Sequence, residues 1–432
     1  MDTYRELLNK FISFRSISTD PQFAQHIEGI VSWLSETFQN HGFTVKRFDG
    51  YNNPIVLASY ETDPSYKTCL IYGHYDVQPA SIEEGWTSEP FEVHEDNERI
   101  YARGAVDNKG QVLVHIATVF DLIKQNKLQY NIKFLIEGNE ETGSPKIADC
   151  IKDNHHMQCD FVLISDGEIN NDTPVIELGF RGGANTTLTI QTATNDLHSG
   201  IYGGAAPSAA HEISKFIASL HDQDRHITIP HFYDNVDPID KAKPIPFDKK
   251  EYTKITGAKD TITEPDYDVH TQIGLRPTIQ VTGIQTGYTG DGYRNSIPAK
   301  ATAKINFRLV KSQDPNKIME QYKKYIKDTL PDYVTHELQI TDPYEGIKLD
   351  VNNEYVKKAE QLLEKSFGSK PIHKYSGGGL PIVTLFHELL RVPQVLIPLG
   401  NEDCNMHGAN ENFDKDILKK ALDFSQQFFS KD

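Results

Sequence analysis

Two short stretches of this 432-residue chain combine the pattern of a buried strand with side chains that can bind metal ions. In LIYGHYDVQP (70–79), an apolar run stops at Gly73, and His74 and Asp76 follow it closely. In RIYARGAVDNKG (99–110), Asp107 lies between a glycine-containing turn and a predicted helix. Imidazole and carboxylate groups are common ligands of zinc and similar divalent cations. The two stretches therefore raise the question of whether they contribute to one site.

Further acidic and imidazole side chains follow other apolar runs along the chain. In open α/β sheets the carboxyl ends of the strands share one edge, where ligands bind. Taken alone, each of these residues is weak support for a site, because acidic residues are usually solvated and an aspartate can simply cap a helix. Their common position after strands favours a shared site, and its members would be His74, Asp107, Glu140, Glu141, Asp166 and His407.

This donor set suits two divalent cations, with zinc the first choice. Carboxylates packed together in a partly dry cleft are costly unless cations neutralise them. Asp107 is the natural bridging ligand, because its segment lies between the others. Asp76 is expected to accept the second ring N–H of His74. Of the adjacent Glu140 and Glu141, one can bind metal while the other acts as a general base toward a metal-bound water.

Composition and charge exclude several other classes of protein. The formal charge of −17, from 44 Lys and Arg against 61 Asp and Glu, argues against a nucleic-acid partner. No apolar run reaches the roughly 18–20 residues of a membrane span. The first 18 residues have the spacing of an amphipathic helix rather than a signal peptide. Four scattered cysteines suit reduced thiols, so we expect a cytoplasmic protein without a membrane partner.

The length predicts two domains, and the first 180 residues have the pattern of an α/β fold. Residues 68–73, 132–138 and 160–165 are apolar without polar alternation, as in strands buried on both faces. The helix that follows Asp107 should place its apolar residues on one face, and Asp107 should cap its start. These units predict a mainly parallel central sheet flanked by helices.

The middle of the chain predicts a different, α+β domain. Residues 185–192 and 301–310 alternate with period two, each precedes a helical segment, and 335–341 adds a third strand. Residues 228–277 are predicted to form a long surface excursion. Strand and helix patterns of the first type return near residue 354. We therefore expect a catalytic domain over 1–181 and 347–432, interrupted by an inserted lid and dimerisation domain over 182–346.

An ordered set of motifs resembles the M20 metallopeptidase family, specifically its dipeptidase branch of the cytosolic non-specific dipeptidase and carnosinase type. The motifs cover most of the chain in the family's order, which makes the set far more specific than any single motif. They are GHYDVQPA, GWTSEPFEV, IYARGAVDNKGQ, EGNEETGS, SDGE, DLHSGIYGG, NSIPAKA and MHG. The resemblance implies a zinc-peptidase-like catalytic domain, a homodimer formed through the inserted domain, and hydrolysis of short unblocked peptides.

The resemblance also implies a role for individual residues. His74, Asp107 and Asp166 would bind one zinc ion, and Asp107, Glu141 and His407 would bind the other. Glu140 would be the catalytic base, Asp76 would support His74, and the Asp107–Asn108 peptide bond would be cis. The residues that would hold substrate are His198, Asn295, Arg308 and the loop Gly377, Gly378 and Gly379. In dimeric relatives the histidine at the position of His198 completes the neighbouring subunit's site.

The resemblance leaves alternatives open. Relatives often have serine within GGSIP where this chain has GGGLP, with Gly379 in place of the serine. The relatives' preference for particular substrate side chains is therefore not carried over to this chain. From the residues alone, Arg308 reads as a solvent-facing arginine and the glycines as an ordinary turn. Manganese or cobalt could replace zinc. An N-acyl-amino-acid deacylase shares every metal ligand, and a non-catalytic metal-binding protein is a more distant alternative.

Overall fold

The computed structural model of the chain describes residues 1–239, 247–378 and 380–431. It divides the chain into two compact units. Unit 1 comprises Met1–Leu178, Leu349–Lys374 and Leu380–Asp432, and unit 2 comprises Gly179–Lys348 and Tyr375–Gly379. Among the helices of the described residues, none is both long and apolar enough to cross a bilayer.

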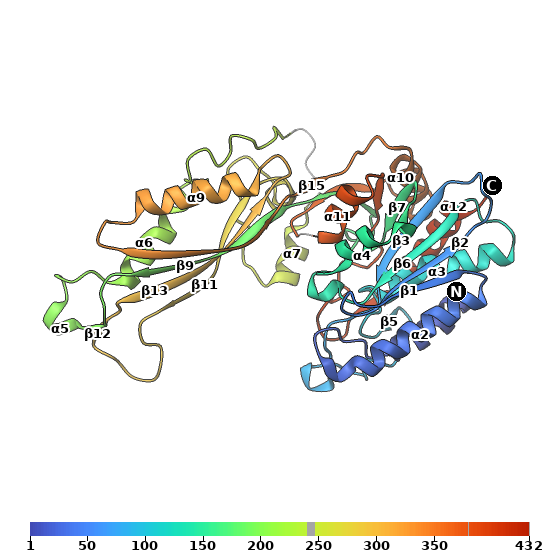
Figure 1. Ribbon diagram of the computed structural model, residues 1–432, viewed down its shortest axis with the longest axis horizontal. Helices are drawn as coiled ribbons and strands as arrows, with labels where there is room; N and C mark the ends of the chain where they lie inside the picture. Colours follow the sequence, from blue (N-terminus) through green and yellow to red (C-terminus); the bar gives the residue numbers. More distant parts are fainter. Residues whose placement is uncertain (240–246, 379, 432) are drawn as a thin grey trace. The chain divides into compact units, whose positions relative to one another are not determined.

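A mixed sheet forms the centre of unit 1 (Figure 1). Its middle strands run parallel, and its outer strands pair antiparallel. This confirms the predicted α/β class with a mainly parallel central sheet. The order is β1 (Thr44–Phe48), β2 (Ile55–Tyr60), β6 (Asn131–Glu137), β3 (Thr68–His74), β7 (Phe161–Ile164), β17 (Gln394–Leu396) and β8 (Val175–Phe180), with β16 (Ile372–Ser376) paired to β8. The last two residues of β8 also pair with β15 (Ile347–Lys348), and these four residues are assigned to unit 2.

The helices of unit 1 pack in layers around this sheet. They are α1 (Asp2–Ile12), α2 (Ala24–Asn40), α3 (Lys109–Lys124), α4 (Ile147–Asp153), α10 (Glu354–Phe367), α11 (Pro381–Leu389) and α12 (Lys415–Phe429). Helix α3 lies against β3 on one side and against α1 and α12 on the other. It is consequently buried on all sides from Lys109 to Phe120, and not only on the apolar face predicted from the sequence. Only a helix with one side in water needs a polar face.

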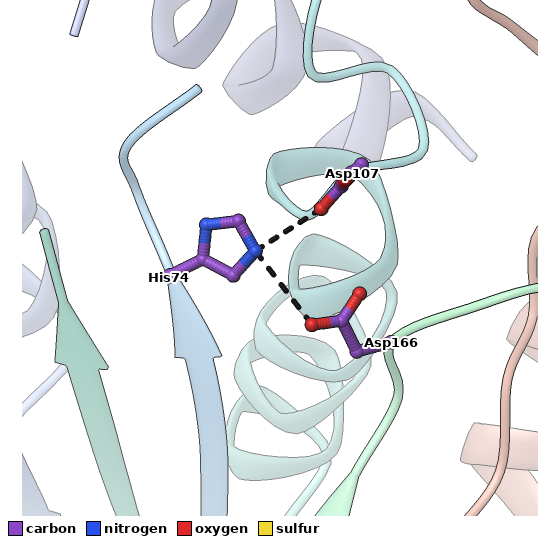
Figure 2. Close-up of side chains that lie close together, drawn as sticks. All are labelled: His74, Asp107 and Asp166. Atoms are coloured by element: carbon purple, nitrogen blue, oxygen red, sulfur yellow. Dashed lines mark hydrogen bonds and ion pairs between the residues drawn. The ribbon is translucent and has the colours of Figure 1, made fainter. Parts of the chain in front are cut away.

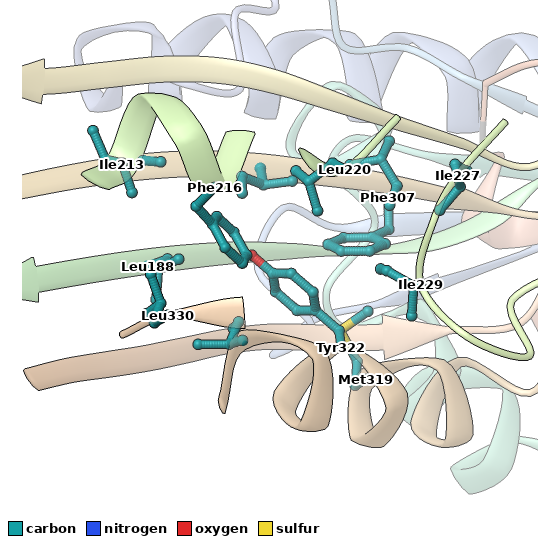
Figure 3. Packing of buried hydrophobic residues seen from close by; sticks show 14 of the residues in the cluster. Leu188, Ile213, Phe216, Leu220, Ile227, Ile229, Phe307, Met319, Tyr322 and Leu330 are labelled. Atoms are coloured by element: carbon teal, nitrogen blue, oxygen red, sulfur yellow. The ribbon is translucent and has the colours of Figure 1, made fainter. Parts of the chain in front are cut away.

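Unit 2 is built on a four-stranded antiparallel sheet in the order β11 (Thr278–Thr286), β13 (Lys300–Leu309), β9 (Gly182–Gln191) and β14 (Thr335–Tyr344). Helices α6 (Ala209–Ser219) and α9 (Pro315–Thr329) share one apolar core with the inward-facing residues of this sheet. Figure 3 shows Phe216, Phe307 and Tyr322 in contact there. The alternating residues of β9 and β13 are therefore buried on the helix side and polar on the other.

The sequence pattern predicts only three of these strands and does not indicate β11. Its sequence TIQVTGIQT alternates only in its first half, where Ile279 is buried, and contains a glycine at a bulge. The segment predicted as a surface excursion contains helices α7 (Lys249–Thr256) and α8 (Val269–Gly274) within its described part. The remaining short elements of unit 2 are β10 (Leu197–His198), α5 (Ser199–Tyr202) and β12 (Ser296–Ile297).

A second, three-stranded sheet in unit 1 borders the candidate site. Its order is β18 (Asn412–Asp414), β5 (Arg99–Tyr101) and β4 (His94–Glu95). The register pairs Asn412 with Tyr101. This pairing brings the segment just before β18 next to the loop that leads from β5 to α3.

Candidate functional site

Four of the predicted site residues lie at the carboxyl ends of neighbouring parallel strands. His74 is the last residue of β3. Glu140 and Glu141 form a short 3-10 turn (η3, Glu140–Thr142) after β6, and Asp166 follows β7. Because β6, β3 and β7 are parallel neighbours, their carboxyl ends meet at one edge of the sheet. The fold therefore brings together residues from segments far apart in the chain.

Two loops add the remaining members of the cluster. Asp107 lies in the loop before α3, and His407 lies in the loop between β17 and β18. The prediction that Asp107 caps α3 was wrong, because Asn108 occupies the N-cap position and makes no side-chain cap hydrogen bond. The Asp107 carboxylate instead points at two imidazoles. The Asp107–Asn108 peptide bond is cis, as the resemblance implied.

The first group of potential ligands is His74, Asp107 and Asp166 (Figure 2). His74 Nε2 lies 3.1 Å from Asp107 Oδ1 and 3.6 Å from Asp166 Oδ2. Figure 2 shows the two carboxylates approaching the same ring nitrogen. His74 is completely buried, and Asp107 is 5% exposed. The nitrogen and the two carboxylate oxygens thus lie close together at a buried edge of the sheet.

The second group is Asp107, Glu141 and His407. His407 Nε2 lies 2.8 Å from Asp107 Oδ2 and 3.2 Å from Glu141 Oε2. In each group the ligand atoms all lie within 4.8 Å of one another. The two groups share Asp107, which presents a different oxygen to each imidazole.

Glu140 belongs to neither group, although it lies beside them. Its Oε2 is 4.0 Å from His74 Nε2, and its side chain is 18% exposed. The two adjacent glutamates thus differ in position, because the turn of η3 directs Glu141 toward His407 and leaves the Glu140 carboxylate outside the two ligand groups.

Asp76 contacts both His74 and the turn that carries Glu140 and Glu141. Its two carboxylate oxygens accept from the backbone N–H groups of Glu140 and Glu141, each at 3.2 Å. The second ring nitrogen of His74 lies 3.0 Å from the Asp76 backbone oxygen and 3.3 Å from its Oδ1. The sequence predicts only the carboxylate as a partner of this nitrogen. A residue not predicted for the site is Gln78, whose Nε2 donates to Glu141 Oε2 at 2.8 Å, although Gln78 lies in the same motif as His74.

The electrostatics of the cluster fit a pair of divalent cations. Burial, together with the carboxylates of Asp166, Asp107 and Glu141, raises the pKa of Glu140 to about 8, against the opposing effect of His74. Hydrogen bonds to Asp107 and Glu141 raise the pKa of His407 to about 10. The cluster thus concentrates negative charge that positive charge must balance. Imidazole nitrogens and carboxylate oxygens are also the donors that zinc takes.

The other predicted site residues lie in unit 2. His198 ends β10, and its Nδ1 accepts the backbone N–H of Gly200 at 3.0 Å. The Asn295 carbonyl accepts from Ser199 N at 3.0 Å, which places Asn295 beside the same turn. Arg308 lies on β13, and its Nη1 donates to Tyr344 Oη at 2.9 Å.

The glycine loop of unit 2 is described in part. The Gly377 carbonyl accepts from Nε and Nη2 of Arg181, both at 3.1 Å. At Gly378 an added Cβ would meet no atom within 4 Å, so this position is open. Gly379 lies outside the described residues. Arg181, which holds this loop by donating to the main-chain oxygen of Gly377, is not predicted by the sequence.

Comparison with known proteins identifies a peptidase family for this chain. Residues 70–431 match the Peptidase family M20/M25/M40. The match spans most of the chain, so the protein belongs to this peptidase family, and the resemblance found in its motifs is confirmed.

The chain is similar to several named peptidases. The chain is 28% identical to the human Beta-Ala-His dipeptidase, over 96% of this chain and 87% of that protein. It is 30% identical to the Cys-Gly metallodipeptidase DUG1 of Saccharomyces cerevisiae, over 94% and 90%. Among solved structures, human carnosine dipeptidase 1 superposes with a TM-score of 0.79 at 26% identity, over 99% and 95%. The M20 family metallo-carboxypeptidase Sso-CP2 of Sulfolobus solfataricus gives 0.84 at 30% identity, over 99% and 98%.

Proposed function

We propose that this protein is a metal-dependent dipeptidase that hydrolyses the peptide bond of short unblocked peptides. The observation that carries the proposal is the sharing of Asp107 between two histidine–carboxylate groups, with Glu140 beside both and bound into neither. The names of the relatives, which include dipeptidases for Beta-Ala-His and Cys-Gly, support the same class of substrate.

Two divalent cations, zinc in the first instance, would be held by this chain's own ligands. His74, Asp107 and Asp166 would hold one, and Asp107, Glu141 and His407 the other. When bound, such a pair lowers the pKa of water and polarises a carbonyl oxygen. The complete burial of His74 and the hydrogen bond from Gln78 to Glu141 keep these side chains in place before any cation arrives.

Glu140 is the proposed general base. It would accept a proton from the water that attacks the scissile carbonyl carbon, and would pass that proton to the leaving amine as the C–N bond breaks. The products are then a free carboxylic acid and a free amine. Asp76 would fix the direction of the Glu140 carboxylate by holding the backbone N–H groups of the turn.

Residues of unit 2 would hold the substrate. The Nδ1 of His198 accepts a hydrogen bond, so the neutral ring carries its proton on Nε2 and can donate from there. A donor of this kind can stabilise the oxyanion formed on attack. Arg308 can grip a substrate carboxylate through its forked donors. Asn295, the main chain at Gly377 and Gly378, and also Gly379, complete the proposed set.

We further propose a homodimer formed through the inserted domain and a location in the cytoplasm. In the dimer His198 would serve the site of the neighbouring subunit. All four cysteines are free thiols, which suits a reducing compartment.

A panel of substrates tests the proposed function. Purified protein supplied separately with Zn²⁺, Mn²⁺ or Co²⁺ is incubated with unblocked dipeptides, longer peptides and N-acylated amino acids, and released amino acids are quantified. We expect hydrolysis of dipeptides, abolished by chelation and by Glu140→Gln but unaffected by Glu6→Gln on the exposed side of α1. Cleavage of acylated amino acids alone would identify a deacylase instead.

A further inference from the structure

We infer that the buried ion pair between Arg103 and Glu411 is a positioning device that holds together the two loops carrying Asp107 and His407. The inference rests on the proposed metal centre, because these loops supply the shared ligand and the histidine of the second group. Arg103 is 2% exposed, Glu411 is 0% exposed, and Arg103 Nη1 lies 2.7 Å from Glu411 Oε2. Neither residue belongs to the two ligand groups found among the described residues.

The Glu411 carboxylate accepts hydrogen bonds from three backbone N–H groups of the loop that leads to and includes Asp107. Its Oε2 accepts from the backbone N–H of Gly104 at 3.0 Å, in addition to Arg103. Its Oε1 accepts from the backbone N–H groups of Val106 at 2.8 Å and Asp107 at 2.9 Å. A carboxylate removed from water needs such donors. The hydrogen bonds from Val106 and Asp107 also determine where the backbone of Asp107 lies.

The Arg103 guanidinium holds the other loop. Its Nη2 donates to the carbonyl oxygens of His407 at 3.1 Å and Gly408 at 3.2 Å. His407 has a φ of 61°, in the left-handed region that few non-glycine residues adopt. The guanidinium also lies over the ring of Trp86, 5.4 Å from its centroid. The Arg103 side chain thus holds the backbone of His407 in its left-handed conformation.

A role in stability alone explains this arrangement poorly. Burial of an ion pair adds little net stability, because the cost of desolvation offsets the attraction. The geometry of the centre, in contrast, depends strictly on both loops, since Asp107 faces His74 at 3.1 Å and His407 at 2.8 Å. A shift between the loops would separate Asp107 from His407 while His74 stays at the end of β3. The second ligand group therefore depends most on the ion pair.

The test compares Glu411→Gln with a matched variant elsewhere in the chain. Arg276 and Glu264 form another buried pair, with Nη2 at 2.5 Å and Nε at 2.9 Å from Glu264 Oε2, and Glu264 is 3% exposed. Glu264→Gln removes the same charge from the same kind of pair. It therefore controls for the general cost to the fold.

The measurement is calorimetric titration of the chelator-treated full chain with ZnCl₂, together with the visible spectrum after loading with Co²⁺. We expect Glu411→Gln to bind the weaker cation about 10- to 100-fold less tightly and to change the Co²⁺ absorption bands. Glu264→Gln should bind both cations within about twofold of wild type, because in the described part of the chain Glu264 shares no hydrogen-bond partner with the residues of the two ligand groups. Wild-type binding and spectrum in Glu411→Gln would overturn the inference, and so would equal losses in both variants.

Arg103→Lys is the second variant, because it keeps the charge but lacks the fork that reaches both loops. It should weaken binding of the same cation while the cation-free protein keeps its circular dichroism spectrum. If both Glu411→Gln and Arg103→Lys unfold without cations, the pair supports the whole fold and the inference fails. The wild-type titration separates this result from the proposed function. Two bound cations without peptide hydrolysis would refute only the dipeptidase, whereas fewer than two would refute the metal centre and the inference together.

Discussion

His407 Nε2 lies 2.8 Å from Oδ2 of Asp107, although 300 positions separate the two residues in the chain. The other oxygen of the same carboxylate faces His74. One side chain therefore links the parallel strands of the first half of the chain to the loop near its C-terminus. A change at Asp107 should affect both ligand groups, whereas a change at a residue of one group should affect that group alone.

Asp107→Asn is expected to lose both cations, because an amide cannot serve as an anionic ligand on two sides. Asp166→Asn should retain about one cation per chain, since the second group stays complete. Elemental analysis of gel-filtered protein measures both values. Retention of two cations by Asp107→Asn would contradict the shared role of this carboxylate.

Glu140→Gln should keep both cations and lower kcat by about 10²–10⁴, because it removes a general base without removing a ligand. Glu141→Gln makes the same substitution at the adjacent residue, and this variant should lose a cation. The experiment combines steady-state kinetics with elemental analysis of the same samples. The assignment of base and ligand would fail if the two variants lost metal equally.

A mixed dimer tests the proposed contribution of His198 to the neighbouring subunit. His198→Ala and Glu140→Ala chains should each be nearly inactive, since loss of one oxyanion donor costs about 10²–10³ in rate. Refolding the two chains together in equal amounts should restore about a quarter of wild-type activity, because random pairing into two-fold dimers leaves one intact site in each mixed dimer. Verified mixed dimers without recovered activity would show that His198 does not act across subunits.

Gly110→Ala is expected to destabilise unit 1. An added Cβ would lie 1.7 Å from the carbonyl oxygen of Ala105, and the backbone on both sides is held within the core. We expect a loss of about 3 kcal/mol in the free energy of unfolding, at the upper end of typical overpacking costs. Gly283→Ala, where the nearest atom would be 3.7 Å away, should cost less than about 1 kcal/mol. Chemical denaturation measures both, and similar losses would contradict the packing at Gly110.

The buried His115 should make stability depend on pH below neutrality. Burial lowers its pKa from 6.5 to about 3, and its ring nitrogens lie 3.0 Å from Ser425 Oγ and 2.9 Å from Ser165 Oγ. Between these two pH values the unfolded chain binds one more proton at this residue, so its contribution to stability falls as the pH falls. The slope for this single group is at most about 1.4 kcal/mol per pH unit.

The measurement is the difference in unfolding free energy between wild type and His115→Gln as a function of pH. Wild type should lose its advantage over the variant as the pH decreases from 6.5 toward 4, because glutamine does not titrate. A difference that stays constant over this range would show that His115 titrates normally in the folded protein.

Much of the fold could be predicted because the apolar pattern that defines each strand or helix lies within a short segment of the sequence. Strands buried on both faces need continuous apolar residues, so the segments that became β3, β6 and β7 were recognisable, and their parallel pairing followed from the alternation with helices. Because parallel strands end at one edge, the expected proximity of His74 and Asp166 followed from topology alone.

The sequence by itself thus determined the class of fold, the type of each side chain at the strand ends and the order of the motifs. Only the tertiary structure decided which partner each side chain takes. Asp107 could have capped α3 as its local sequence suggested, but it faces His74 and His407 instead. Arg103 and Glu411 gave no local signal, because 308 positions separate them and their pairing depends on the register of β5 with β18. Hydrogen bonds and ion pairs are short-range, so distant partners are defined only when the whole chain has folded.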